Sequence, residues 1–191
     1  MIIIPIFVDE PIKNKCNLWS VCYKDDYQKG KPLDIFSQLF NLWNDDSYLF
    51  DFFKEHQEDL ASPFWSGMSI DEAIDNVLDE ANDFETELRS IELRLPGSEK
   101  KQLSDIFQEL HKHEYRLKPQ YKSYRKAKPS YAAMLRLYGI ELEDGCIIVT
   151  GGAIKISVNM DRPHLIKEKG RLTQIRNFLK EQGINSREGL I

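Results

Sequence analysis

The apolar residues of the chain alternate or cluster like strands near its two ends and recur with helical spacing between them. Residues 1–8 form an apolar run interrupted by Pro5, and residues 17–23 (NLWSVCY) are rich in β-formers. Each run predicts a strand, the first of them buried. In residues 34–43, and again from 49 to about 60, apolar side chains three and four apart predict two helices. Their many aromatic side chains favour packing in the hydrophobic core. A binding site for a ligand, lined by these aromatic side chains, is the alternative.

Residues 69–91 give the clearest helical pattern. Ser69 and Glu72 have the spacing of a capping box, in which each side chain accepts a hydrogen bond from the other residue's backbone N–H. Acidic residues recur every four positions on the polar side of this helix: Asp71, Asp75, Asp79, Asp83 and Glu87. A solvated helix face explains them. A docking surface for a basic partner, or a mimic of nucleic-acid charge, is the functional alternative.

Two further predictions concern the segments that flank this helix. Residues 62–67 (SPFWSG) predict a turn whose Phe64 and Trp65 pack inward. After the Pro96-Gly97 turn, Ser98 is placed to cap a third helix that runs to about residue 115.

The segment 131–157 predicts two or three strands joined by short turns. Residues 134–142 alternate as a strand in which Arg136 stands among apolar neighbours, a costly position unless the charge is paired or reaches a cleft. Asp144-Gly145 predicts the turn, and Gly151-Gly152 permits a bend or bulge in the following strand. Lys155 would then lie on a strand next to Arg136, and the two side chains could flank one concave surface.

These patterns together predict an α+β protein. We expect a small antiparallel or mixed sheet flanked by helices, with a largely helical N-terminal half. The last helix begins after Asp161, with Pro163 in its first turn, and ends at Gly183. The chain of 191 residues contains neither repeats nor a low-complexity linker. We therefore expect a single domain with a helical insertion at about residues 34–114.

The net charge of −5 hides a strong asymmetry along the chain. Residues 1–110 carry 10 Lys and Arg against 23 Asp and Glu, whereas residues 111–191 carry 16 against 8. Such an asymmetry suggests an acidic and a basic half with different partners. Mutual attraction of the two halves within the fold is the simpler alternative.

The densest positive charge lies at residues 111–128 (HKHEYRLKPQYKSYRKAK), where tyrosines alternate with basic residues. Lysine and arginine neutralise phosphates, and aromatic rings stack on unpaired bases, so this mixture favours RNA over duplex DNA. A solvated basic segment that pairs with the acidic helices is the alternative. The predicted RNA-binding residues are Lys118, Tyr121, Lys122, Arg125, Lys126 and Lys128.

Several function classes find no support in the sequence. Cys16, Cys22 and Cys146 have no C-x-x-C spacing, so we expect reduced, partly buried thiols rather than a disulfide framework or a zinc site. No metal-ligand set and no Cys/His catalytic pair can be named, and we expect no cofactor. The first apolar run lacks the features of a signal peptide, and no run is long enough to span a bilayer. We therefore expect a cytoplasmic protein that does not bind membranes.

The C-terminal pattern resembles that of a known family. The run R-L-Y-x-I, an acidic turn, I-V-T-G-G-A-I-K-I-S and then Pro163-His164 with a charged helix are similar to the C-terminal half of RelE/HigB-like toxins. These are toxins of bacterial type II toxin–antitoxin systems, with phage-derived relatives. The similarity covers about 60 residues, and the N-terminal half resembles longer members more loosely.

The resemblance implies an endoribonuclease that cuts messenger RNA, usually on the ribosome, and is neutralised by a small antitoxin. In that family the RNA 2′-hydroxyl attacks the adjacent phosphate without a metal ion. By position, Arg136 and Lys155 match catalytic residues of the family, although Ile156 and Ser157 replace a second lysine and a threonine that often follow. Tyr124 and His164 are further catalytic candidates from their chemistry alone. A non-catalytic protein that binds RNA or protein through the same fold is the alternative hypothesis.

Overall fold

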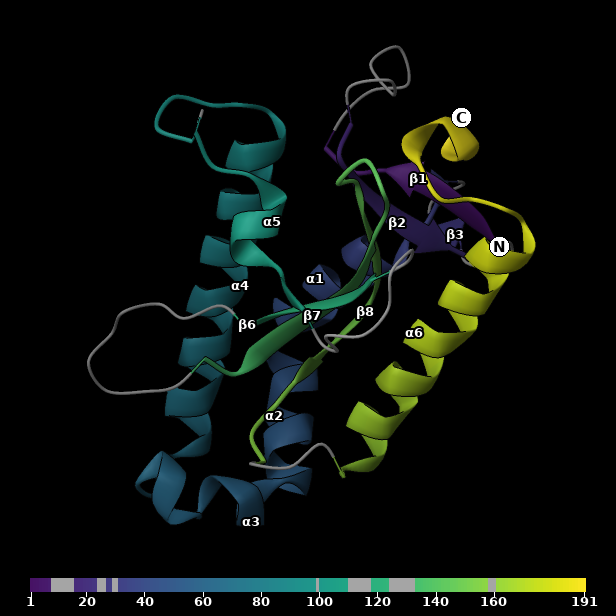
Figure 1. Cartoon of the computed structure of the whole chain (residues 1–191). Coiled ribbons are helices and arrows are strands. Elements are labelled where there is room, and N and C mark those ends of the chain that lie inside the picture. Colours follow the sequence, from purple (N-terminus) through teal and green to yellow (C-terminus); the bar gives the residue numbers. More distant parts are fainter. Residues whose placement is uncertain are drawn as a thin grey trace.

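Strands from both ends of the sequence meet in one six-stranded sheet of order β1-β2-β8-β7-β6-β5 (Figure 1). The computed structural model describes residues 1–7, 16–23, 27–28, 31–98, 100–109, 118–123, 133–157 and 161–191. Its strands are β1 (Ile2–Pro5), β2 (Leu18–Cys22), β5 (Gln108–Glu109), β6 (Lys118–Ser123), β7 (Leu135–Glu141) and β8 (Ile147–Ile154). A separate ribbon joins β3 (Tyr27–Gln28) to β4 (Lys31–Pro32). Neighbouring strands of the large sheet are antiparallel except β2 and β8, which are parallel.

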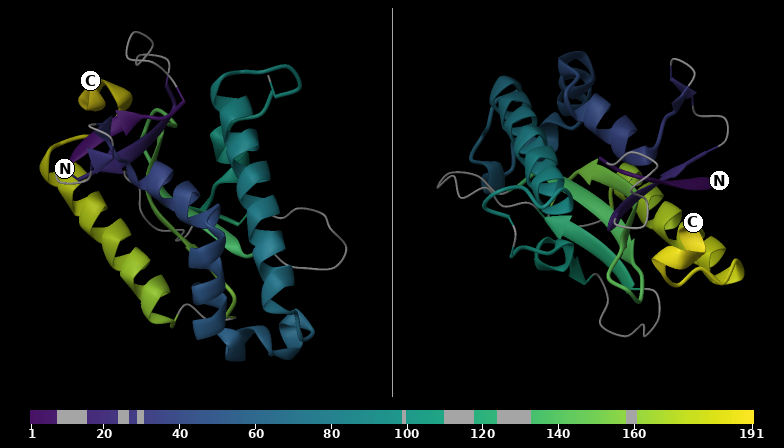
Figure 2. Two further views of the ribbon diagram at one scale, coloured as in Figure 1. Left: turned by 180° about the vertical axis from the view of Figure 1, so that it is seen from behind. Right: turned by 90° about the horizontal axis from the view of Figure 1, so that it is seen from above.

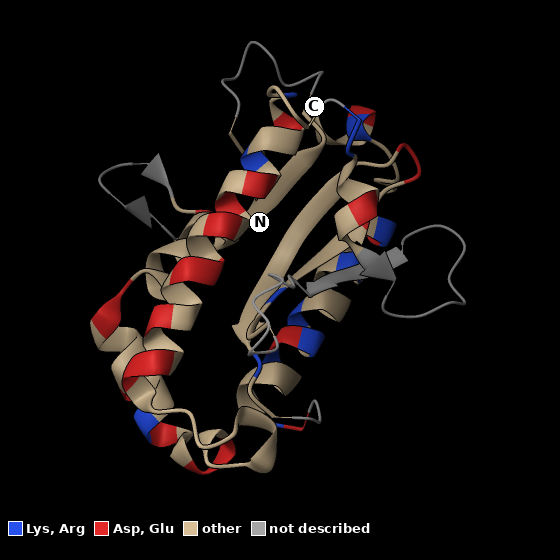
Figure 3. Cartoon of the chain, turned by 90° about the vertical axis from the view of Figure 1, so that its left-hand side faces the viewer, with Lys and Arg blue, Asp and Glu red and all other residues tan. Residues whose placement is uncertain are grey.

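Helices cover both faces of this sheet. They are α1 (Ile35–Trp43), α2 (Asp46–Glu55), α3 (Gln57–Leu60), α4 (Ile70–Glu92), α5 (Leu103–Ile106) and α6 (Pro163–Glu181), with short 3-10 helices at Pro63–Trp65 and Arg187–Leu190. The helices α1, α2 and α4 lie on one side of the sheet and α6 lies on the other (Figures 2 and 3). The predicted α+β class, with a mixed sheet flanked by helices and a largely helical N-terminal half, is confirmed.

The helix starts follow from local side-chain chemistry. Asp34 caps α1 by accepting from the Ser37 N–H, and Ser69 and Glu72 form the predicted capping box at the start of α4. The apolar face of α4 is buried through Val77 and Phe84. Most aromatic residues of α1 and α2 also lie in the core, as predicted, although Phe50 is 43% exposed.

The strand β8 contains the bulge that Gly151-Gly152 suggested. Tyr138 pairs with Gly151, but the next residue of β7, Gly139, pairs with Val149, so Thr150 is the extra residue. The Thr150 hydroxyl donates to the Tyr138 carbonyl across the irregularity. Because the bulge shifts the alternation of side chains along β8, it decides which residues beyond it face α6.

Three predictions about burial or helix length are wrong. The first strand, β1, is a half-buried edge strand rather than a buried one, and its Ile2 is 39% exposed. The second helix is interrupted at His56, where α2 ends and α3 begins. In the turn that follows, only Trp65 packs inward, where its indole N–H donates to the Ile156 carbonyl at 2.6 Å, while Phe64 is 58% exposed.

The predicted third helix is also wrong in its start and its length. The Ser98 hydroxyl hydrogen-bonds the Ser90 and Leu95 carbonyls instead of capping a helix. The helix α5 has four residues, begins after Gln102, and gives way to β5. The last part of the predicted helix, residues 110–115, lies outside the residues that the structure describes. Within the described ranges, no helix has both the length and the apolar character that crossing a membrane requires.

Candidate functional site

Arg136 of β7 and Lys155, the first residue after β8, lie diagonally across from each other. Arg136 pairs with Ala153, and the Lys155 N–H donates to the Met134 carbonyl at 2.7 Å. Residues paired across strands, and those two positions further along, point to the same face. Ala153 packs against Leu165 of α6, so both basic residues belong to the α6 side of the sheet.

The two basic side chains are close enough to affect each other's charge. Both are half-buried. Burial lowers the pKa of the Lys155 ammonium, and the positive charge of Arg136 lowers it further. The Arg136 Nη1 donates to the carbonyls of Ala133 and Leu135, and the Lys155 Nζ donates to the Ser157 carbonyl at 3.0 Å. Main-chain oxygens therefore orient both cations at the start of β7 and the end of β8.

A buried carboxyl group supports the same end of β7 from the opposite face. Glu80 of α4 accepts hydrogen bonds from the N–H groups of Met134 and Leu135, at 2.9 to 3.0 Å. Burial raises the pKa of Glu80 to about 7, although these hydrogen bonds and the charge of Arg136 oppose the rise. Glu80 thus fixes the backbone from which Arg136 projects.

The structure describes the remaining predicted RNA-binding residues only in part. Lys118, Tyr121 and Lys122 belong to β6, whose backbone lies beside β7, with Tyr121 paired to Tyr138 and Lys122 to Leu137. Other predicted site residues lie outside the described residues: Tyr124, Arg125, Lys126 and Lys128.

His164 lies in a different environment from the two cations. It is in the first turn of α6, where its Nε2 donates to the Ile154 carbonyl at 3.0 Å. Its ring meets those of His56 and Phe52 edge-on, with centroids 5.1 Å and 5.4 Å away. Burial lowers the pKa of His164, and the hydrogen bond to Ile154 partly offsets this effect. His164 therefore joins α6 to α2 rather than joining the Arg136–Lys155 pair.

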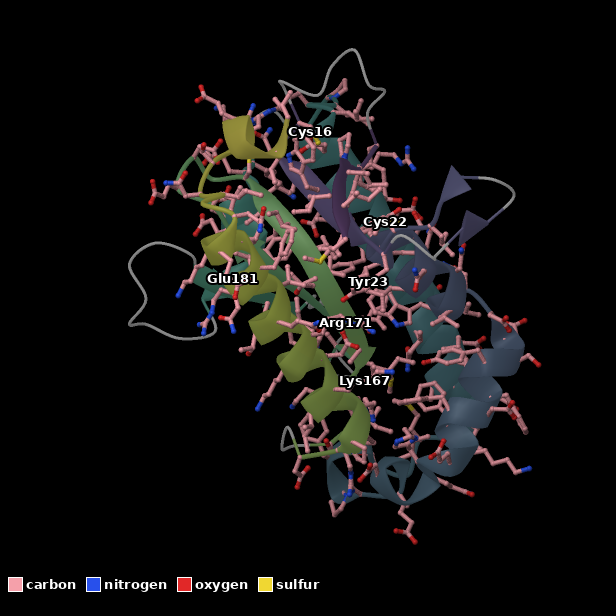
Figure 4. All side chains as sticks on the ribbon, turned by 90° about the vertical axis from the view of Figure 1, so that its right-hand side faces the viewer. Cys16, Cys22, Tyr23, Lys167, Arg171 and Glu181 are labelled. Atoms are coloured by element: carbon pink, nitrogen blue, oxygen red, sulfur yellow. The ribbon has the colours of Figure 1, made fainter. Side chains whose placement is uncertain are left out.

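The rings of His56 and His164 line a pocket of about 530 Å³ between the α1–α2 pair and α6. Trp43 and Phe52 contribute apolar surface to it. Charged residues line it from both sides: Asp51 and Glu55 from α2, and Lys167, Glu168 and Arg171 from α6. Figure 4 shows Lys167 and Arg171 in the space between α6 and the α1–α2 pair.

Sequence reasoning missed this pocket because it depends on topology. The parallel strands β2 and β8 lie side by side, and the helices that follow them, α1 and α6, cover opposite faces. A crevice forms at the carboxyl ends of such strands, where ligands of open α/β sheets commonly bind. Only the pairing of β2 with β8 creates this arrangement, and no local motif indicates that pairing.

Sequence reasoning also missed three buried glutamates that accept hydrogen bonds from backbone N–H groups in the strands or directly before them. Besides Glu80, they are Glu92, which accepts from Asn17 N–H at 2.7 Å, and Glu168, which accepts from Gly152 N–H at 3.1 Å. Burial raises the pKa of all three. Each stands on the apolar stripe of its helix, as Glu168 does between Leu165 and Leu172. An acidic residue on the apolar face of a predicted helix is unusual, and this feature of the sequence could have indicated the three glutamates.

The three cysteines are all buried as free thiols, deeper than the partial burial expected from the sequence. Burial raises the pKa of Cys146 to about 11 and raises that of Cys16 further, so neither favours the reactive thiolate. Among the described residues, no group of three or more His, Cys, Asp or Glu is placed to hold a metal ion.

Comparison of the chain with protein-family models, curated proteins and solved structures finds no match. The chemistry of the residues and their geometry therefore carry the functional inference. Within the part of the chain that the structure describes, two places offer such chemistry. They are the Arg136–Lys155 pair beside β6 and the pocket between α1–α2 and α6.

Proposed function

We propose that the protein is a toxin-like endoribonuclease that binds messenger RNA beside β6, β7 and β8. The observation that supports this proposal best is the placement of Arg136 and Lys155 on one sheet face, where burial and then the charge of Arg136 lower the pKa of Lys155. Holding two like charges together in a half-buried position costs free energy, and a bound phosphodiester would offset that cost. The backbone of β6, which comes from the basic tyrosine-bearing stretch, lies alongside.

The proposed reaction is attack of an RNA 2′-hydroxyl on the adjacent phosphorus without a metal ion. The new P–O2′ bond replaces the P–O5′ bond, which leaves a 2′,3′-cyclic phosphate and a 5′-hydroxyl end. Arg136 would stabilise the charge that develops on the phosphoryl oxygens. Lys155, whose pKa is lowered by burial and by the charge of Arg136, would transfer a proton to or from the reacting oxygens. Tyr124 remains a further candidate for proton transfer.

The biological setting follows from the resemblance to RelE/HigB-like toxins. On this basis the protein would be cytoplasmic and bacterial, and it would cleave messenger RNA. Cleavage would take place on the ribosome, as it usually does in that family. A small antitoxin protein would neutralise it.

Cleavage of a defined single-stranded RNA tests this function. We expect Arg136→Gln and Lys155→Gln each to slow cleavage by about a hundredfold, because each removes a group that acts on the transition state. Cleavage should persist in EDTA and stop when the nucleotide that carries the attacking hydroxyl is 2′-deoxy. Lys169→Gln is the matched control, because Lys169 is an exposed basic residue of α6.

The outcomes separate the two functional hypotheses. RNA that is bound but remains intact, alone and on ribosomes, would contradict catalysis and favour the non-catalytic RNA-binding alternative. Failure to bind RNA at all would contradict both. Equal loss of cleavage in Lys169→Gln would show that general positive charge, rather than the Arg136–Lys155 pair, is what matters.

A further inference from the structure

The edge of β8 beyond the bulge presents unpaired main-chain groups to the pocket between α1–α2 and α6. The strand β2 pairs with β8 only from Ile147 to Val149. Further along β8, the Gly152 N–H donates to Glu168 and the Ile154 carbonyl accepts from His164, so both residues direct main-chain groups away from β7. The N–H and C=O of one strand residue point the same way.

The Gly152 carbonyl and the Ile154 N–H therefore also point toward the pocket that both residues line. The Lys155 N–H bond to Met134 shows that Gly152 and Ile154 belong to the non-hydrogen-bonded pairs between β7 and β8. The pairing with β2 ends before them, so among the described residues no ladder bond reaches either group. Both residues are buried, and buried main-chain groups in native proteins nearly always have a partner. The pair thus indicates a ligand that supplies one donor and one acceptor.

A carbonyl and an N–H two residues apart form the pattern by which a strand binds one residue of a parallel neighbour. That residue donates its N–H to the carbonyl and accepts with its C=O from the N–H. The same register relates β2 to β8, in which Ile147 N–H donates to the Asn17 carbonyl. From this geometry we infer that the pocket binds a free α-amino acid, whose main chain continues the line of β2 along β8.

The charges at the two ends favour a free amino acid over the interior of a peptide. Glu168 Oε2 lies 3.1 Å from Gly152 N, which places a carboxyl group where the ligand's ammonium would bind the Gly152 carbonyl. At the other end, His164 in the first turn of α6 lies beside Ile154, and a helix N-terminus favours a carboxylate. The pocket's volume of about 530 Å³ is in the range of small-molecule sites.

The side chain of this ligand would point toward α6. The ligand residue lies opposite Ala153, and paired residues share a face, which here is the face that packs against Leu165. Lys167 and Arg171 line the pocket from that helix (Figure 4). Arg171 forms an ion pair with Glu168, in which its Nη1 lies 3.0 Å from the Glu168 Oε1. The Lys167 ammonium on this wall therefore selects for an acidic side chain, so the expected ligand class is an acidic α-amino acid, glutamate or aspartate.

Isothermal titration of the whole chain with L-glutamate and L-aspartate tests this site. We expect saturable 1:1 binding of at least one of them, and affinities about tenfold or more lower for glutarate and N-acetyl-L-glutamate, which lack the ammonium group. In a parallel NMR titration, the Ile154 amide should shift and become protected from hydrogen exchange. Absence of saturable binding, or equal binding of the N-acetyl compound, would overturn the inference.

Matched variants of α6 locate the site. Lys167→Glu should weaken L-glutamate binding by about tenfold or more, because it places a negative charge on the wall that faces the side chain. Lys169→Glu makes the same charge change at an exposed position of α6 outside the pocket lining and should bind as the unmodified chain does. Equal affinity of the two variants would overturn the assignment to this pocket.

Glu168→Gln gives a second, isosteric variant. Glutamine keeps a carbonyl oxygen that can accept from the Gly152 N–H, but it lacks the negative charge beside the ligand's ammonium. We expect L-glutamate to bind about tenfold more weakly to this variant, with glutarate affected far less. A similar loss for both ligands would contradict the proposed position of the ammonium group.

Discussion

Raising the pH from 4.5 to 8.5 should reduce the free energy of unfolding by about 3 kcal/mol through Glu80 alone. Burial raises the pKa of this carboxyl group from 4.5 to about 7, so the folded chain holds the proton more tightly than the unfolded chain does. The stabilisation is complete below the ordinary pKa and is lost as the pH rises through about 7. Glu92 and Glu168, whose pKa is also raised by burial, act in the same direction. Urea unfolding curves at the two pH values measure the total.

The variant Glu80→Gln isolates this contribution. Its neutral amide keeps one oxygen for the Met134 and Leu135 N–H groups but cannot ionise, so about 3 kcal/mol of the pH dependence should disappear. The control is Asp75→Asn, which removes the same charge from an exposed position of α4 and should leave the pH dependence unchanged. The same pH dependence in Glu80→Gln as in the unmodified chain would show that Glu80 does not titrate in this range.

Gly152→Ala should destabilise the fold by about 3 kcal/mol, because the new methyl group has no space. A Cβ at this position would lie 2.8 Å from the Arg136 carbonyl oxygen and 2.9 Å from side-chain carbons of Leu39 and Trp43. The first of these is a backbone atom of β7, so relief requires the two central strands or α1 to move. Thermal and urea unfolding at a fixed pH measure the loss.

Gly170→Ala is the matched control for this substitution. Gly170 lies within α6, and apart from its chain neighbours and the backbone of its own helix no described atom lies within 4 Å of a Cβ built there. Alanine favours the helix by about 1 kcal/mol over glycine, so this variant should be more stable than the unmodified chain. A destabilisation of similar size in both variants would contradict the steric explanation for Gly152.

Local signals in the sequence were sufficient for elements whose ends depend on neighbouring residues. The capping box of Ser69 and Glu72 predicts the start of α4, because both hydrogen bonds form within one helical turn. The prediction of the third helix was wrong because its end depends on residues far away in the sequence. Leu103 and Phe107 have helical spacing, but the chain after Ile106 pairs with β6, and that strand pairing overrides the local pattern.

The candidate sites divide in the same way. Strand alternation placed Arg136 and Lys155 on adjacent strands, but their common face depends on the Thr150 bulge, whose register the sequence does not reveal. The pocket could not be predicted, because Lys167 and Asp51 face it from helices that only the tertiary fold brings together. Glu80 was missed, although its place on the apolar stripe of α4 is a signal in the sequence, whereas no signal indicates the amides that it binds, in residues 134–135.

The central position of β8 has a consequence for how the chain can fold as it leaves the ribosome. Leu18 and Trp19, near the start of the chain, have their sheet partners in Ile147 and Ile148, near its end. The apolar surface of α1 and α4 packs on a sheet that cannot exist until these late residues have been made. During synthesis the nascent chain should therefore expose a large apolar surface for a long time. Such chains fold slowly and need chaperones to prevent aggregation.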